Sequence, residues 1–317
     1  MAADAAETDE DDAAPPLAMP PPATLDAAPG LDAFLLEGAE GNLWFERRGP
    51  VLFVTFDNLA TLDIPYPRAP WMQARVAGLG YSLLGVQSFA KDWFRQATAP
   101  SLIRGLQQRG FFAQFDTVVL AGASMGGFAA LNFAPLIPGA RVLAFSPQST
   151  MSRAIAPFER RFSHPVNRMN WTDQPFLDAA AAVPYVRSAV ILYDPFVPED
   201  KAHAARLAGP GVRFVRLGHA SHQAIRMVVK SDALPQMLRE FAETGDIGAE
   251  FWGNLRRRKR LRSWRRNLVA ALAQRRHPRL LLRACDTMLA EGDYLFARSA
   301  RRKVLEEHPE LAARRAR

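Results

Sequence analysis

The most constraining feature of this sequence is an apolar run that ends in a glycine-bounded turn around a serine. Residues 117–121 read TVVLA and are followed by Gly122-Ala123-Ser124-Met125-Gly126, a G-x-S-x-G pattern. A continuous β-branched run predicts a strand buried on both faces, and the small residues after Gly126 predict a helix. Because glycine has no Cβ, Gly122 and Gly126 allow the flanking segments to approach closely. The pattern therefore predicts a sharp strand-to-helix turn that exposes the Ser124 hydroxyl.

Strand-like and helix-like segments alternate around this turn from residue 81 to residue 245. Strands are predicted at residues 42–47, 51–56, 81–87, 117–121, 141–145, 189–193 and 212–217. Helices are predicted at residues 100–114, 126–135, 198–207 and 223–243, the last broken or kinked at Pro235. With right-handed crossovers, this alternation predicts a doubly wound, mostly parallel α/β sheet whose ligands bind at the carboxyl ends of the strands. The proline-rich residues 146–187 are predicted to cap that edge.

The strand, turn and helix around Ser124 resemble the nucleophile elbow of the α/β-hydrolase superfamily. The resemblance covers roughly residues 31–245, and the chain also offers an acid and a histidine in the order that the superfamily uses. It implies an α/β-hydrolase fold and a Ser-His-Asp triad. It also implies that the backbone N–H of Met125, at the start of the helix, stabilises an oxyanion.

The acid of this triad is predicted after the strand at residues 189–193. Asp194 directly follows that strand and precedes Pro195, as in the acid turn of the superfamily. Asp194 is therefore the predicted acid. Asp200 is the competing candidate, but it falls in the first turn of the next helix, where a carboxylate commonly serves only to complement the helix dipole.

The base is predicted in the loop after the strand at residues 212–217, which contains two histidines. His222 immediately precedes the last helix of the body, at the place where the superfamily has its base. His219 follows the strand directly and is the alternative base. We expect His222 to accept the proton of Ser124 and later to protonate the leaving group.

Three further features of the site are expected. The second oxyanion donor is expected after the strand at residues 51–56, from the backbone N–H of Asn58 or Leu59, although FDNLA replaces the His-Gly motif common there. Lys91 and Trp93 follow another strand at the same edge and are candidates to line the substrate site. No phosphate-binding loop, G-x-G-x-x-G or H-E-x-x-H pattern is present, so no metal or other cofactor is predicted.

Basic residues are concentrated at the C-terminal end of the chain. Residues 251–317 hold 19 Lys or Arg against 6 Asp or Glu, whereas residues 1–250 hold 21 against 26. Within this end, apolar residues recur every three or four positions at Leu261, Trp264, Leu268 and Leu272 and predict an apolar stripe on a basic helix. Such a helix over residues 255–276 suits an anionic surface or a protein partner. The alternative is a helix that docks on a neighbour with its arginines in water.

The sequence predicts three parts. Residues 1–30 are rich in alanine, proline and acids and are expected to form a disordered tail. Residues 31–247 are expected to form the hydrolase domain, and residues 248–317 a basic helical extension. Within the extension, residues 281–309 loosely resemble one tetratricopeptide repeat. A single repeat cannot bury its own apolar face, so we expect a helical hairpin that docks on the body or on a partner.

Composition also bounds compartment and function. The chain has one cysteine, no apolar window long enough to cross a membrane and an acidic first dozen residues, which favours the cytoplasm. The predicted function is cleavage of an ester, thioester or related acyl bond in a small-molecule or glycan substrate, through an acyl-enzyme. Transfer of the acyl group is left open. The alternative is a non-catalytic binding or scaffold protein that acts through its basic C-terminal helices.

Overall fold

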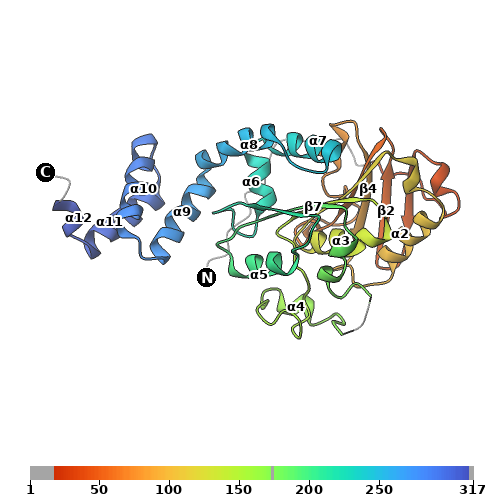
Figure 1. The fold of residues 1–317 in the computed structure, drawn as a ribbon, viewed down its shortest axis with the longest axis horizontal. Helices are drawn as coiled ribbons and strands as arrows, with labels where there is room; N and C mark the ends of the chain where they lie inside the picture. Colours follow the sequence, from red (N-terminus) through yellow and green to blue (C-terminus); the bar gives the residue numbers. More distant parts are fainter. Residues whose placement is uncertain (1–17, 173–174, 314–317) are drawn as a thin grey trace.

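A central eight-stranded sheet organises the computed structural model, which describes residues 18–172 and 175–313 (Figure 1). The strands lie in the order β1-β2-β4-β3-β5-β6-β7-β8. Their bounds are β1 Ala33–Glu37, β2 Gly41–Glu46, β3 Val51–Phe56, β4 Ser82–Ser88, β5 Thr117–Ala123, β6 Arg141–Phe145, β7 Ser188–Tyr193 and β8 Val212–Arg216. Only β2 runs antiparallel to its neighbours, β1 and β4, while the other pairs are parallel. The predicted doubly wound, mostly parallel sheet is confirmed.

Helices bury both faces of this sheet, which explains the uninterrupted apolar strands. In β3, Leu52 and Val54 join the core beneath α2 and α3, whereas Phe53 joins the opposite core beneath α1, α6, α7 and α8. The helices of the body are α1 Gln73–Ala77, α2 Thr98–Gln108, α3 Met125–Phe133, α4 Ser163–Val166, α5 Pro198–Arg206, α6 Ala224–Lys230, α7 Leu234–Thr244 and α8 Ala249–Leu255. The predicted break within residues 223–243 is present, and Pro235 lies in the first turn of α7, where a missing N–H costs nothing.

The prediction of a disordered tail over residues 1–30 is wrong for residues 18–30. The N–H of Ala23 donates to the carbonyl of Leu35 and the N–H of Leu35 donates to that of Pro21, at 3.0 and 2.8 Å. Ala28 is fully buried. The segment thus pairs with β1, the edge strand of the sheet, through backbone groups, which composition does not reveal. Residues 1–17 of the predicted tail lie outside the described residues.

A helical C-terminal extension is present, as predicted, and consists of α9 Arg262–Gln274, α10 Pro278–Glu291, α11 Leu295–Glu307 and α12 Glu310–Ala313 (Figure 1). These helices share a small apolar core that is separate from the cores of the body. Helix α8 belongs to the body instead, because Phe251 and Leu255 are fully buried against α7 and its neighbours. The packing therefore changes after α8, later than the expected division after residue 247. No described helix is long and apolar enough to cross a membrane.

Candidate active site

The serine turn lies where β5 passes into α3. Ser124 has a φ of 51°, in a region that residues other than glycine rarely adopt. A Cβ on Gly122 would lie 2.1 Å from the carbonyl oxygen of Gly126, and a Cβ on Gly126 would lie 2.6 Å from that of Phe56. Both glycines are therefore required by the close approach of the flanking segments. The predicted strand, turn and helix are confirmed as a local structure.

The structure brings His222 to Ser124. His222 lies in the loop between β8 and α6, and its Nε2 is 2.9 Å from Ser124 Oγ. The imidazole is partly exposed, while its Nδ1 faces the interior toward a carboxylate. A serine hydroxyl and an imidazole at this distance form the pair in which the nitrogen can take the hydroxyl proton.

The carboxylate that meets His222 is Asp200, so the prediction of Asp194 is wrong for this contact. Asp200 Oδ1 and Oδ2 lie 2.8 and 3.0 Å from His222 Nδ1. Asp194 instead accepts the backbone N–H groups of Phe196 and Ser221, at 2.9 and 2.8 Å. Both oxygens of Asp194 are thus occupied in joining two loops, and the first turn of α5 carries Asp200 to the histidine.

Burial and hydrogen bonding act on Asp194 in opposite directions. Burial raises the pKa of Asp194, whereas the hydrogen bonds from the backbone of Phe196, Ser221 and His219 lower it, and burial dominates. The residue links the turn after β7 to the loop that carries His222. Its position supports a structural role in holding that loop.

Asp200 is also held by an arginine from the segment between β6 and β7. Arg161 Nη1 donates to Asp200 Oδ1 at 2.9 Å, and Arg161 Nη2 donates to Glu159 Oε2 at 2.6 Å. Burial would raise the pKa of Glu159, but hydrogen bonds from His203 and Arg161, with the charge of Arg161, lower it to about 2. Glu159 is therefore a fixed negative charge that holds Arg161 beside Asp200.

A second serine, histidine and acid group lies nearby but has no access to solvent. His203 Nε2 is 3.0 Å from Glu159 Oε2, and its Nδ1 accepts the backbone N–H of Ser149 at 3.1 Å. Ser149 and His203 have no exposed surface, and Glu159 is 3% exposed. No substrate can reach this group, so its part is to anchor the segment containing Ser149 and Glu159 on α5.

His219, the alternative base, contacts aromatic rings, and no hydrogen bond joins its side chain to Ser124 in the described part of the chain. Its ring packs against Phe196 and Trp264, with centroid distances of 4.8 and 5.5 Å. Burial lowers the pKa of His219, the charge of Asp194 raises it, and the charge of Arg275 lowers it further. The ring is thus part of a contact between the body and α9.

Helix α9 supports the loop that carries both histidines. Trp264 Nε1 donates to the carbonyl of Gly218 and Asn267 Nδ2 donates to the carbonyl of His219, each at 3.0 Å. The guanidinium carbon of Arg275 lies 3.9 Å from the centre of the Phe196 ring. The basic helix is therefore docked on the body next to the candidate site.

Gln148 is a site residue that the sequence analysis missed. Its Nε2 donates to Ser124 Oγ at 2.9 Å, and its Oε1 accepts the indole N–H of Trp93 at 3.2 Å. It follows β6 at the same sheet edge as Ser124, and the rule that polar residues at strand ends meet there would have identified it.

The two residues expected to line the substrate site differ in exposure, and the lining role of Lys91 stays a prediction. Trp93 is fully buried behind Gln148, so it supports a site residue and presents no open surface to a substrate. Lys91 Nζ is paired with Asp63 at 2.7 Å, and both side chains are largely exposed.

The backbone N–H groups expected to stabilise the oxyanion differ in whether they already have an acceptor. Met125 is the first residue of α3, where backbone N–H groups have no acceptor within the helix. The N–H of Asn58 donates to Thr61 Oγ1 at 2.8 Å, so it is already engaged. Leu59 lies in the same turn, and no hydrogen bond of its N–H is seen.

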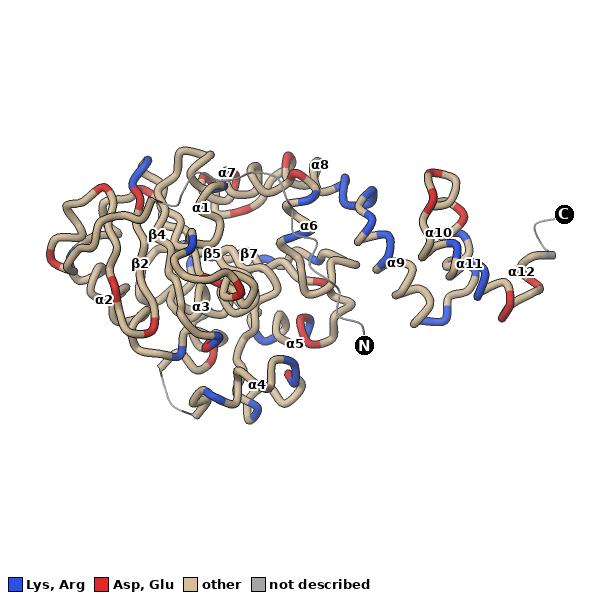
Figure 2. Tube along the Cα trace, turned by 180° about the vertical axis from the view of Figure 1, so that it is seen from behind, with Lys and Arg blue, Asp and Glu red and all other residues tan. Residues whose placement is uncertain are grey.

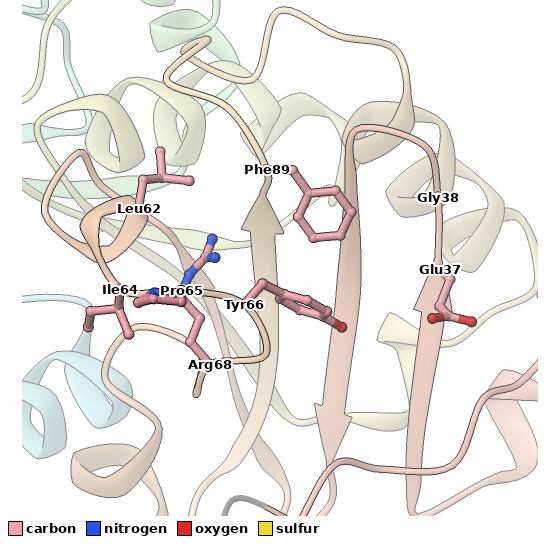
Figure 3. Close-up of a pocket in the computed structure, with 8 residues that line it drawn as sticks. All are labelled: Glu37, Gly38, Leu62, Ile64, Pro65, Tyr66, Arg68 and Phe89. Atoms are coloured by element: carbon pink, nitrogen blue, oxygen red, sulfur yellow. The ribbon is translucent and has the colours of Figure 1, made fainter.

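A hollow of about 450 Å³ lies beside the loop between β3 and β4 and is lined by the eight residues labelled in Figure 3. The rings of Tyr66 and Phe89 meet edge to face on one side, with their centres 5.1 Å apart. Arg68 contributes to the lining and is paired with buried Asp57 at 2.7 Å. Ser124, Asp200 and His222 do not line this hollow.

Comparison with known proteins gives similarity in structure alone. Neither a protein-family model nor a curated protein sequence matches the chain. Three similar solved structures are the capsule O-acetyltransferase of Neisseria meningitidis serogroup A, the Pyrococcus horikoshii acylaminoacyl peptidase and the glycosylation associate protein (Gap123) complex of Streptococcus agalactiae.

The three structures differ in how much of each chain is matched. The acetyltransferase is 11% identical over 64% of this chain and 93% of its own, with a TM-score of 0.43. The peptidase is 12% identical over 70% and 43%, with a TM-score of 0.49. The Gap123 chain is 13% identical over 69% and 48%, with a TM-score of 0.50. At these identities the similarity concerns the fold.

Proposed function

We propose that this chain, which has the α/β-hydrolase fold, is a serine hydrolase that cleaves an ester, thioester or related acyl bond. The observation that carries the proposal is the continuous contact from Ser124 Oγ to His222 Nε2 and from His222 Nδ1 to Asp200. Each atom is at hydrogen-bond distance from the next, in the order that activates a serine. The strained Ser124 backbone supports the same conclusion, because such strain concentrates at functional sites.

In the proposed reaction, Ser124 Oγ attacks the carbonyl carbon of the substrate while its proton passes to His222 Nε2. The carbonyl π pair moves to the oxygen, where the N–H of Met125 at the start of α3 is suited to stabilise it. Asp200 holds the tautomer of His222 and stabilises the imidazolium. The imidazolium then protonates the leaving alcohol, thiol or amine, and collapse of the intermediate leaves an acyl-enzyme.

The second half of the reaction determines whether the chain hydrolyses or transfers the acyl group. Water that attacks the acyl-enzyme, with His222 as base, yields a carboxylic acid. An alcohol at the same position yields a new ester, and a sugar hydroxyl is one such alcohol. A small-molecule or glycan acyl substrate is compatible with both. The partly buried Phe162 ring, 6.0 Å from that of His222, supports an apolar contribution to the acyl site.

Labelling of the folded protein by a fluorophosphonate tests the proposal. We expect one covalent adduct per chain, located on Ser124 by peptide mass spectrometry, because among residues 18–172 and 175–313 only that hydroxyl contacts a partly exposed histidine. Ser149 also contacts a histidine but is fully buried, so it should remain unmodified and serves as an internal control. A folded protein that takes no label, or takes it elsewhere, would contradict the assignment.

A second candidate function, binding of an anionic lipid surface, is favoured by the charge around η7, Arg256–Arg260, and α9. Residues 251–276 contain ten Lys or Arg and no Asp or Glu, and this stretch is visible as a basic band in Figure 2. Trp252 is 38% exposed at its beginning, and exposed tryptophan beside basic residues is typical of membrane-surface segments. We propose that this band attaches the protein to anionic lipid. This attachment does not depend on an active serine, so it would also serve the alternative of a scaffold protein without catalysis.

Removing four charges from the band tests this second function. A variant with glutamine at Arg256, Lys259, Arg260 and Arg262, which are all exposed, should lose most of its binding to phosphatidylserine vesicles at low salt. Each basic side chain near such a surface contributes about 1 kcal/mol, and salt weakens the attraction.

The matched control places glutamine at Arg279, Arg283, Arg302 and Lys303, which are exposed on α10 and α11. It removes the same charge but should bind vesicles almost as the wild type does. Co-sedimentation across a salt series measures both variants. Equal loss in the two variants would show that net charge, and not the band, determines binding. Preference for a nucleic acid over vesicles would reject the lipid assignment.

A further inference from the structure

The side-chain amide of Gln148 has a defined orientation. The indole N–H of Trp93 can only donate a hydrogen bond, so the group that faces it at 3.2 Å must be the amide oxygen, Oε1. The amide nitrogen Nε2 is then directed at Ser124 Oγ, 2.9 Å away. Both Gln148 and Trp93 are fully buried, so the pair is held by its surroundings. An N–H donor is thus presented to the serine oxygen by a fixed side chain.

The backbone around Trp93 is strained in a way that supports this placement. Trp93 and Phe94 both have a φ of 53°, which is rare for bulky residues and even less expected for two in succession. Asp92 maintains the turn, because its Oδ1 accepts the N–H of Phe94 at 2.9 Å and the hydroxyl of Ser88 at 3.1 Å. Strain that surrounding contacts sustain is typical of functional sites.

The site needs a second donor. Of the two expected ones, the N–H of Asn58 is engaged, whereas that of Leu59 has no acceptor among the described residues but also makes no hydrogen bond to Ser124 there. A tetrahedral intermediate is usually stabilised by two donors. The N–H of Met125 can be the first, but that of Asn58 already donates to Thr61 Oγ1 at 2.8 Å. The oxygen that becomes negative is bonded to the same carbon as Ser124 Oγ in the intermediate, so it forms close to the Gln148 amide.

We propose that Gln148 is a catalytic residue that supplies this second oxyanion donor, a role that rests on the proposed function. In the resting site its amide donates to Ser124 Oγ while the hydroxyl proton points to His222 Nε2. When Oγ bonds to the carbonyl carbon and its proton moves to His222, the carbonyl π pair becomes the charge on the oxygen. The amide of Gln148 then donates to that oxygen, as side-chain amides do in other oxyanion holes.

Replacement of Gln148 by methionine or by glutamate tests this role. Gln148→Met keeps the length of the side chain and removes both polar groups. Gln148→Glu keeps an oxygen for the Trp93 indole and replaces the donor with a negative charge. With p-nitrophenyl acetate in single-turnover experiments, we expect both variants to acylate about 10²- to 10³-fold more slowly, with substrate affinity little changed. Arg104→Met, at an exposed residue of α2, is the control and should acylate at the wild-type rate.

A second readout separates catalysis from packing. Affinity for a trifluoromethyl ketone, which forms a tetrahedral adduct with serine, should fall with the acylation rate in both Gln148 variants. Trp93→Phe removes the indole donor, frees the amide to rotate, and should show a smaller loss of acylation rate. These results would support the role. The proposed role of Gln148 would be overturned if a Gln148→Met or Gln148→Glu variant that is folded by circular dichroism acylated at the wild-type rate. A loss confined to substrate affinity would also overturn it.

The wild-type protein distinguishes failure of this role from failure of the proposed function. If wild-type protein is labelled at Ser124 and acylates normally but both Gln148 variants match it, only the role of Gln148 is overturned. If the folded wild-type protein neither acylates nor takes a fluorophosphonate label, the proposed function is rejected and the role of Gln148 with it.

Discussion

His222→Ala lowers kcat for p-nitrophenyl acetate by about 10⁴- to 10⁶-fold in the expected result, because Ser124 then has no acceptor for its proton. Replacement of a nucleophilic serine or its histidine alone removes nearly all of the benefit of a triad. His219→Ala should leave kcat in the wild-type range, since its ring contacts Phe196 and Trp264 and not Ser124. Steady-state kinetics on the two variants gives the comparison directly.

Thermal unfolding of the same two variants provides the control. The imidazole of His219 is half-buried between two aromatic rings, so its removal should lower the unfolding temperature. His222 is partly exposed and should affect stability less. The assignment of the base would be rejected if His219→Ala proved inactive and His222→Ala retained turnover.

Asp200→Asn is expected to lower kcat by about 10⁴-fold while the protein stays folded. The amide keeps the size of the carboxylate but cannot hold the productive tautomer of His222, whose Nδ1 lies 2.8 Å from Asp200 Oδ1. Arg161 also loses a charged partner at that position, which the remaining bonds to Glu159 partly offset.

Asp194→Asn is the matched variant, since it makes the same chemical change six residues earlier. It should weaken the bonds from the N–H groups of Phe196 and Ser221, and therefore lower the free energy of unfolding by about 1 to 3 kcal/mol, with a smaller loss of kcat. Chemical denaturation and kinetics on both variants decide the matter. A greater loss of kcat in Asp194→Asn would return the acid role to Asp194.

The sheet could be predicted from local patterns in the sequence. Two of the three side chains of the candidate site, Ser124 and His222, are also predicted. The continuous apolar runs of β3, β5 and β7 reflect burial on both faces, which is a property of each strand by itself. Ser124 directly follows the apolar run of β5, whereas His222 is preferred to His219 because the α/β-hydrolase superfamily has its base at that place in the loop. The position of Ser124 could therefore be predicted from its own segment, while that of His222 needed the resemblance to the superfamily.

The aspartate that contacts His222 could not be predicted from local patterns, because the choice depends on the direction of a helix. Asp194 and Asp200 are both near the end of β7, and only the path of α5 determines which carboxylate faces His222. A first-turn acid has a ready explanation in the helix dipole, so the sequence offers no special reason to expect Asp200 to contact His222.

Contacts between distant segments were also beyond the sequence. Trp93 and Gln148 are 55 residues apart, and although the place of Gln148 after β6 marks it as a candidate for the sheet edge, nothing in the sequence pairs it with Trp93. The division after residue 247 followed the change in charge, whereas Phe251 and Leu255 in α8 pack into the body. Composition shows where the basic residues begin, but the end of the hydrolase domain is set by the burial of a few apolar side chains.

The docking of α9 has a consequence for the order in which the protein is made. The loop that carries His222 receives its two hydrogen bonds from Trp264 and Asn267, which are 46 and 48 residues beyond their acceptors. A nascent chain still short of Trp264 has the serine, the histidine and both aspartates but lacks these two supports for the loop. Completion of the loop must therefore wait until the ribosome has released α9.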